Sequence, residues 1–207
     1  TGSLIFLITG FIHGIFIGSS VIISHYFGAE DKERLSTAVH TTIAFGFIAG
    51  ITVTIIGVGG APWFLRLMGT PDDVFGEAVT YLRLYFAGGI AIVMYNTCTG
   101  IFQAIGDSKR PLYYLIMAAS INVVLDILFV AVYDFGIGGA AIATIISQFV
   151  SAILAFIKLI RVDGCYKVYI RRIKIDLDML KRLIKMGIPA GVQNSVISFA
   201  NVIVQKI

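Results

Sequence analysis

The stretch "LYYLIMAASINVVLDILFVAVY", residues 112–133, is predominantly apolar and carries one formal charge, Asp126. An α-helix crosses the hydrocarbon core of a bilayer in about 20 predominantly apolar residues. The stretch therefore predicts a transmembrane helix that holds a carboxylate in its interior. Such a residue is costly in lipid and normally faces the interior of a helix bundle or a wet cavity.

The rest of the chain repeats this apolar pattern. Of its 207 residues, 57% are hydrophobic and 14% are charged, whereas soluble domains carry about 25% charged residues. The strands of a transmembrane barrel would be shorter and would alternate in polarity, which these runs do not. The composition predicts an all-α, polytopic transmembrane helical bundle with six spans, at about 4–27, 37–60, 81–104, 112–133, 136–157 and 186–205.

Basic residues gather in alternate connections. The loops 28–36 and 105–111 and the stretch 158–185 contain most of the 16 Lys and Arg, and all three fall on one side if the six spans alternate. The positive-inside rule makes that side cytoplasmic, so we expect a multi-pass protein of the cell (inner, cytoplasmic) membrane. The net charge of +4 then reflects topology, and no nucleic-acid partner is predicted.

This orientation places residue 1 outside the cell. The sequence "TGSLIFLITGFIHG" enters a span almost at once and lacks the basic start and cleavage site of a signal peptide. We therefore expect the chain to be a piece of a longer protein, with at least one helix before residue 1 and more chain after residue 207.

Local signals predict where two helices begin. Thr70 and Pro71 are typical of an N-cap and a first helical turn, and the helix they open is expected to run on into the span 81–104. The stretch "DLDMLKRLIK", residues 176–185, has apolar residues at helical spacing opposite basic ones and predicts an amphipathic helix on the cytoplasmic membrane face. A solvated basic linker is the alternative.

Polar residues surround Asp126 in the predicted bundle. Asn122 lies one helical turn away on the same face. The next helix runs antiparallel after a hairpin centred near residue 135, so Thr144 is expected at the depth of Asp126 and Gln148 at the depth of Asn122. The spacing thus predicts two polar layers, one of Asp126 with Thr144 and one of Asn122 with Gln148.

Oxygen ligands of this kind suit a small cation. A carboxylate, an amide oxygen and a hydroxyl can bind a proton or Na⁺, because hard cations prefer oxygen. Asp126, Asn122 and Thr144 are therefore a candidate cation-binding set, with transient Na⁺ possible at Asp126. The alternative is that the polar groups are interhelical hydrogen-bond partners only, and for Thr144 and Gln148 taken alone that interpretation is favoured.

Other polar positions carry weaker signals. Besides Gln148, candidates for lining a cavity are Tyr95 and Asn96 in the third span and Gln193 and Asn194 in the unusually polar last span. His13, His25 and His40 have no partner at the spacing of a metal site, so we expect structural roles for them and no resident metal or cofactor. No nucleophile–base pair or HExxH motif is present, which argues against an intramembrane enzyme.

Five stretches together resemble one transporter family. They occur in order across nearly the whole chain: "ISHYFGAEDKERLS" at 23–36, "GIFQAIGDSKRPLYY" at 100–114, "INVVLDILF" at 121–129, "GIGGAAIAT" at 136–144 and "MGIPAGVQNS" at 186–195. They are similar to the multidrug and toxic compound extrusion (MATE) family, in its prokaryotic, DinF-like branch.

The resemblance implies an architecture of twelve helices in two six-helix lobes. On that template the chain covers helices 2 to 7: residues 1–160 form five first-lobe spans and lack helix 1, residues 161–185 form a cytoplasmic amphipathic linker between the lobes, and residues 186–207 begin the second lobe. In this branch a cation site in the first lobe uses an Asp on helix 1, which this chain lacks, and positions that match Asn122, Asp126 and Thr144.

The resemblance also implies a function. It indicates a cation-coupled antiporter, driven by H⁺ or Na⁺, that exports small amphipathic or cationic drugs and toxins; the lipid bilayer, the first helix and the second lobe would be its partners. Two alternatives stay open at the level of sequence. One is a flippase for lipid-linked oligosaccharides or polysaccharides, which is disfavoured because the spans hold almost no basic residues, and the other is a non-transporting membrane scaffold.

Overall fold

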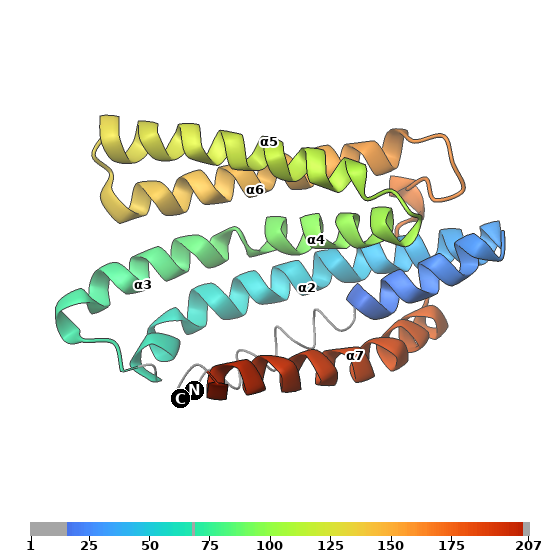
Figure 1. The fold of residues 1–207 in the computed structure, drawn as a ribbon, viewed down its shortest axis with the longest axis horizontal. Helices are drawn as coiled ribbons and strands as arrows, with labels where there is room; N and C mark the ends of the chain where they lie inside the picture. Colours follow the sequence, from blue (N-terminus) through green and yellow to red (C-terminus); the bar gives the residue numbers. More distant parts are fainter. Residues whose placement is uncertain (1–15, 68, 205–207) are drawn as a thin grey trace. The chain divides into compact units, whose positions relative to one another are not determined.

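The computed structural model describes residues 16–67 and 69–204, and over these residues every regular element is a helix (Figure 1). The predicted all-α class is confirmed. The elements are a helix at Phe16–Gly28, α2 at Lys32–Leu67, α3 at Asp72–Ala87, α4 at Gly89–Ala104, α5 at Lys109–Asp126, a π-helix η1 at Ile127–Val132, α6 at Gly136–Arg161, a 3₁₀ turn η2 at Ile170–Arg172 and α7 at Leu177–Val204.

Three of these helices are long and apolar enough to cross a membrane. They are Lys32–Leu67, Lys109–Val132 and Gly138–Arg161, and they contain most of the spans predicted at 37–60, 112–133 and 136–157. The first predicted span, 4–27, lies partly outside the described residues, and its described end forms the apolar helix Phe16–Gly28. The chain is a multi-pass membrane protein.

The predicted span 81–104 is not one straight helix. α3 and α4 pass the span test only together, and they are bent by 41° at a break around Gly88. Two successive glycines, Gly88 and Gly89, weaken the helix here, and the hydroxyl of Thr54 on α2 accepts a hydrogen bond from Ile90 N at 3.1 Å. This bond replaces a helical partner that the break removes. The helix that begins at Asp72 leads into the predicted span as expected, and the bend within that span was not predicted.

The predicted cap at Thr70 is also wrong. α3 begins at Asp72, its N-cap is Pro71, and no side chain caps it by a hydrogen bond. Proline with φ −59° and ψ 146° leads into the helix as an extended residue. The acidic residues of the first turn, Asp72 and Asp73, are instead placed to interact with the positive end of the helix dipole.

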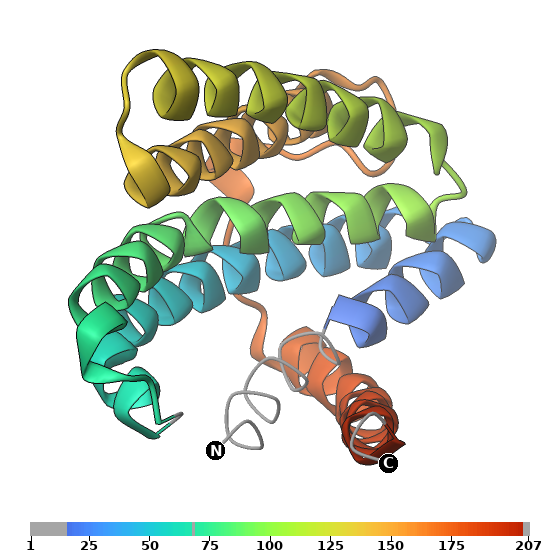
Figure 2. The same cartoon turned by 60° about the vertical axis from the view of Figure 1, so that its left-hand side comes forward.

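The described residues form two compact units, which we treat separately. The second unit consists of 46–99 and 107–159. In it α2 and α4 lie side by side, as do α5 and α6 (Figures 1 and 2). A Cβ atom on Gly46 would lie 2.6 Å from Thr97 Oγ1, and one on Gly50 would lie 3.0 Å from Ile90 Cα. Small residues four apart on α2 thus let α4 approach closely.

The first unit joins segments that are far apart in sequence. It contains the helix Phe16–Gly28, the beginning of α2, the end of α4 and the chain from Ile160 onward. A Cβ atom on Gly18 would lie 2.5 Å from Gly187 N and 2.6 Å from Leu183 O, so this helix and α7 cross backbone against backbone. Ser20 Oγ also donates to Gly100 O at 3.2 Å.

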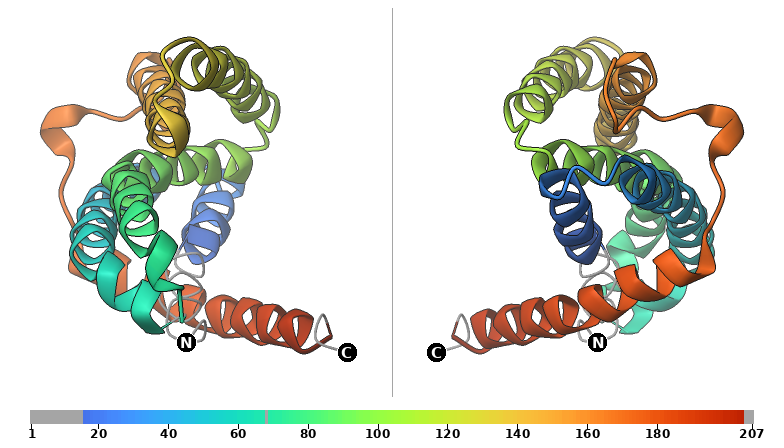
Figure 3. Two further views of the ribbon diagram at one scale, coloured as in Figure 1. Left: turned by 90° about the vertical axis from the view of Figure 1, so that its left-hand side faces the viewer. Right: turned by 90° about the vertical axis from the view of Figure 1, so that its right-hand side faces the viewer.

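Residues 176–185 do not form a helix of their own. They lead without interruption into α7, which runs from Leu177 to Val204 past Pro189 (Figure 3). Their apolar face is partly covered by protein, because Leu183 is fully buried whereas Leu177 is 69% exposed. That this stretch rests on the cytoplasmic membrane face stays a prediction. No helix breaker stands between Lys185 and Gly187 to separate the two predicted segments.

Candidate cation site

The polar cluster predicted on the spans 112–133 and 136–157 lies where α5 faces α6. Asn122 and Asp126 are one turn apart on α5, and Thr144 is on α6. With its amide nitrogen turned toward Asp126, Asn122 donates to Asp126 Oδ2 at 3.3 Å, and its oxygen accepts a hydrogen bond from Thr144 N at 3.3 Å. We adopt this orientation because it gives both amide atoms a suitable partner. Asn122 therefore bridges the other two residues.

The Asp126 carboxylate is only half satisfied. Its Oδ1 is shielded from solvent and accepts no hydrogen bond from the part of the chain that the structure describes. Buried polar atoms are nearly always hydrogen-bonded, so an exception requires a reason. A proton or a cation bound to this oxygen would supply the missing interaction.

The outer face of the same helix contrasts with the cluster. Val123, Val124 and Ile127 are 57%, 64% and 59% exposed. In a membrane-spanning helix an apolar exposed face is suited to contact lipid. The helix therefore keeps its acidic face toward α6 and its aliphatic face outward, as intramembrane carboxylates require.

The register of the cluster differs from the one predicted. The structure places Asn122 against Thr144 rather than against Gln148. The physical reason is η1, a π-helix that occupies Ile127–Val132 between the cluster and the hairpin. A π-helix has more residues per turn than an α-helix, so the same number of residues covers less depth. Counting at the α-helical rise consequently put Asn122 too deep.

Tyr95 and Asn96 make hydrogen bonds outside this cluster. Tyr95 Oη donates to Pro111 O at 2.9 Å, which ties α4 to the beginning of α5. Asn96 Nδ2 donates to Ile92 O at 2.8 Å within its own helix. Gln193 is exposed on α7, whereas the side chain of Asn194 and all of His13 lie outside the described residues. A cavity-lining role for these residues stays a prediction.

His40 has a structural role that sequence reasoning did not specify. It is 4% exposed, its Nδ1 donates to Ser36 O at 2.7 Å, and its Nε2 accepts a hydrogen bond from Tyr169 N at 3.0 Å. Next to it, Thr41 Oγ1 accepts a hydrogen bond from Asp176 N at 3.3 Å. Three consecutive polar residues at 40–42, directly before the apolar part of α2, were the available signal.

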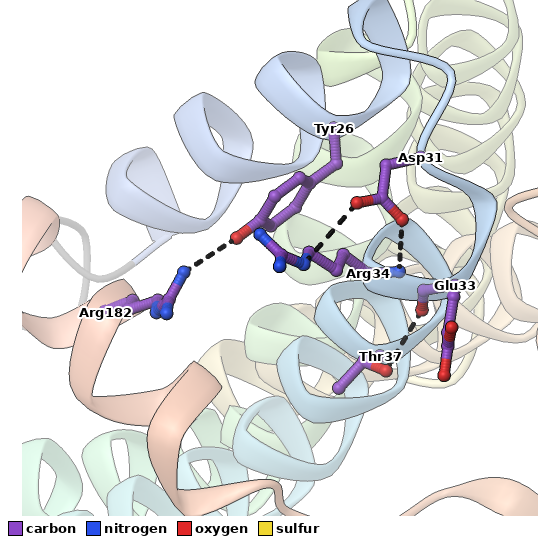
Figure 4. Close-up of polar contacts among 6 residues, drawn as sticks. All are labelled: Tyr26, Asp31, Glu33, Arg34, Thr37 and Arg182. Carbon is purple, nitrogen blue, oxygen red and sulfur yellow. Dashed lines mark hydrogen bonds and ion pairs between the residues drawn. The ribbon is translucent and has the colours of Figure 1, made fainter.

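A second group of polar contacts lies within the first unit, around the beginning of α2 (Figure 4). Arg182 Nη1 donates to Tyr26 Oη at 3.1 Å, which joins α7 to the helix Phe16–Gly28. Asp31 precedes α2 and caps it, since its Oδ1 accepts a hydrogen bond from Arg34 N at 3.0 Å. Its other oxygen lies 3.5 Å from Arg34 Nε.

Comparison with known proteins identifies the family. The family model described as MatE matches residues 1–128. The chain belongs to the MatE family. The resemblance drawn from five short stretches is thus confirmed, and the chain belongs to a family of secondary transporters rather than of enzymes.

Relatives of the MatE chain agree with this assignment. It is 33% identical over 211 residues to the "Probable multidrug resistance protein YoeA" of Bacillus subtilis (strain 168), an alignment that covers 97% of the chain and 45% of the relative. It is similar to a solved "MATE in the bent conformation", with a TM-score of 0.87 at 27% identity over 96% of the chain and 45% of that structure.

A further solved structure shows a transport conformation. The "inward-facing conformation of a multidrug resistance MATE family transporter of the MOP superfamily" matches with a TM-score of 0.83 at 27% identity, over 96% of the MatE chain and 45% of that structure. The chain thus spans less than half the length of the proteins it matches.

Proposed function

We propose that this MatE chain contributes the cation site of an antiporter that exports amphipathic or cationic drugs and toxins in exchange for H⁺ or Na⁺. The observation that carries the proposal is the buried Asp126 Oδ1 without a hydrogen-bond partner among the described residues, beside Asn122 and Thr144. The names of its relatives support multidrug export as the activity.

The cluster could couple ion binding to a change of conformation. When Asp126 is ionised, a negative charge lies between α5 and α6, and when it binds a proton or Na⁺ the charge is cancelled. Ion binding therefore has different free energies in two packings of the helices, which is the condition for shifting a population between them. Alternating access in secondary transporters relies on such a shift.

The same proposal assigns each part of the chain to a lobe or to the linker between the lobes. Residues 1–160 would belong to the first lobe, 161–185 would link the lobes, and 186–207 would begin the second. Asn122 would orient the carboxylate through its hydrogen bond to Asp126 Oδ2, and the hydroxyl of Thr144 would supply an oxygen ligand to Na⁺. The remaining ligands, including an Asp from a first helix, would come from outside residues 1–207.

The test is Asp126→Asn in the intact protein. Asparagine keeps the shape of the side chain but cannot ionise, so we expect normal insertion and the loss of dye efflux driven by either a proton or a sodium gradient in membrane vesicles. The matched control is Asp134→Asn, the same chemical change in the hairpin at a residue with φ 55°, a conformation that asparagine tolerates. Wild-type efflux by Asp126→Asn at equal membrane abundance would refute the proposal.

A further inference from the structure

The connection between α6 and α7 is hydrogen-bonded to α2 at two points. Residues 162–176 form this linker, which includes η2 (orange in Figure 3). His40 and Thr41 on α2 accept hydrogen bonds from the backbone nitrogens of Tyr169 and Asp176, and Val168 between them is 1% exposed. The backbone of the linker is therefore positioned against α2, and the side chains of residues 169–172 and 174 are exposed.

The outward side of the linker combines apolar and basic side chains. Tyr169 is 48% exposed and Ile170 is 62% exposed. Arg171, Arg172 and Lys174 are exposed as well. We call these five residues the linker surface. Arg172 Cζ lies 5.2 Å from the centre of the Tyr169 ring, so the cation and the aromatic ring form one contiguous face.

The positive charges of the linker surface have no acidic partners among the described residues. Of the basic residues nearby, Lys167 Nζ lies 3.5 Å from Asp163 Oδ1, whereas Arg171, Arg172 and Lys174 form no ion pair within 16–67 or 69–204. Asp176, a second nearby carboxylate, is engaged at the start of α7, where its Oδ1 accepts a hydrogen bond from Met179 N at 2.8 Å. Three cations are thus available to an external anion.

We propose that the linker surface binds the phosphate groups of anionic phospholipids in the membrane that the protein spans. The guanidinium groups of Arg171 and Arg172 would bind phosphate oxygens, and the side chains of Ile170 and Tyr169 would enter the boundary between headgroups and acyl chains. A free phosphate ion would match the charges but would leave the exposed Ile170 without an apolar partner. A lipid headgroup with its chains matches both.

This surface adds to the one expected from sequence. In the amphipathic stretch 176–185, Met179 and Leu183 are buried against the protein, and Leu177 is the large apolar side chain that is exposed. The linker that precedes it offers exposed apolar and basic groups together. The proposal goes beyond the transport function, since it does not depend on which ion or substrate is carried.

The experiment measures hydrogen–deuterium exchange of the intact protein in nanodiscs. The discs contain either phosphatidylcholine alone or phosphatidylcholine with phosphatidylglycerol. We expect phosphatidylglycerol to slow exchange in peptides covering 168–175. Arg171→Gln with Arg172→Gln should weaken this binding roughly 30-fold, the factor that corresponds to about 1 kcal/mol for each cation near a charged membrane surface.

Two further variants separate charge from folding. Arg171→Lys with Arg172→Lys keeps both charges and should retain most of the protection, and Ile170→Ser should weaken it without changing the charge. The matched control is Lys32→Gln with Lys109→Gln, which removes two exposed cations from the beginnings of α2 and α5 and should leave the protection unchanged.

Three results would overturn the proposal. They are equal exchange in the two kinds of disc, an equal loss of protection in the control with Lys32 and Lys109, and equal protection by glycerol phosphate added to discs of phosphatidylcholine alone. Asp126→Asn should keep full lipid protection, so failure of the transport proposal would be distinguishable from failure of this one.

Discussion

At the scale of single residues, a substitution of Thr144 can distinguish a structural role of its hydroxyl group from an ion-binding role. Thr144 Oγ1 donates to Ala140 O at 3.0 Å within its own helix. Such a bond adds little to stability, so the main effect of its removal should be on any ion that the oxygen binds. Thr52 on α2 makes the same kind of bond, from its Oγ1 to Ile48 O at 2.8 Å, and is exposed.

We therefore expect Thr144→Val to alter ion dependence more than stability. The free energy of unfolding should change by less than about 1 kcal/mol, while the ion concentration needed for half-maximal efflux should rise. Both quantities can be measured on the purified intact protein, by thermal unfolding and by dye efflux from proteoliposomes. Thr52→Val is the control and should change neither. An unaltered ion dependence in Thr144→Val would remove Thr144 from the proposed site.

At the scale of elements, the helix Phe16–Gly28 and α7 meet backbone against backbone. Gly18→Ala would place a methyl group 2.5 Å from Gly187 N, and backbone on both sides cannot yield as a flexible side chain could. We expect a loss of stability of about 1–3 kcal/mol, the usual cost of overpacking. The measurement is the thermal stability of the detergent-solubilised intact protein.

Gly28 of the same helix provides the control for this prediction. A Cβ atom there meets nothing within 4 Å. Gly28→Ala should therefore leave stability unchanged or raise it by up to about 1 kcal/mol, because alanine favours helix more than glycine does. If Gly18→Ala is as stable as Gly28→Ala, the backbone crossing with α7 is not as close as described.

The elements also show what could be predicted from sequence. Apolar length alone predicted α2, α5 with η1, and α6, and helical spacing predicted that Asn122 and Asp126 share a face. The break at Gly88 was missed because Thr54, whose hydroxyl accepts the hydrogen bond of Ile90 N next to the break, comes from a distant part of the chain. The π-helix was missed because nothing in "ILFVAV" distinguishes it from an α-helix. Tertiary packing decided both.

At the scale of the whole molecule, the distribution of basic residues predicts orientation. Positive residues concentrate in the loops 28–36 and 105–111 and in the stretch 158–185, which the positive-inside rule assigns to the cytoplasm. Cys98 is buried and Cys165 is partly exposed in the linker. A variant with Cys98→Ala therefore leaves Cys165 as the natural reporter within residues 1–207, on the predicted cytoplasmic side.

We expect a membrane-impermeant maleimide to label this variant only in permeabilised cells. Adding Cys165→Ala and Ser108→Cys should give the same result, because Ser108 lies in another loop of that side. Cys165→Ala with Tyr133→Cys should be labelled in intact cells, since Tyr133 is 58% exposed in the opposite hairpin. Labelling with the sides exchanged would contradict the predicted orientation.

The π-helix η1 links the geometry of the hairpin to the orientation of the Asp126 side chain. Because its backbone winds more slowly than an α-helix, the six residues from Ile127 to Val132 turn α5 through a smaller angle before the chain reverses at Tyr133. The direction in which Asp126 points around the axis of α5, and so whether it faces α6, consequently depends on η1, which lies between Asp126 and the hairpin. Deleting or inserting one residue there would rotate the carboxylate away from Thr144 even though every ligand remained in the sequence.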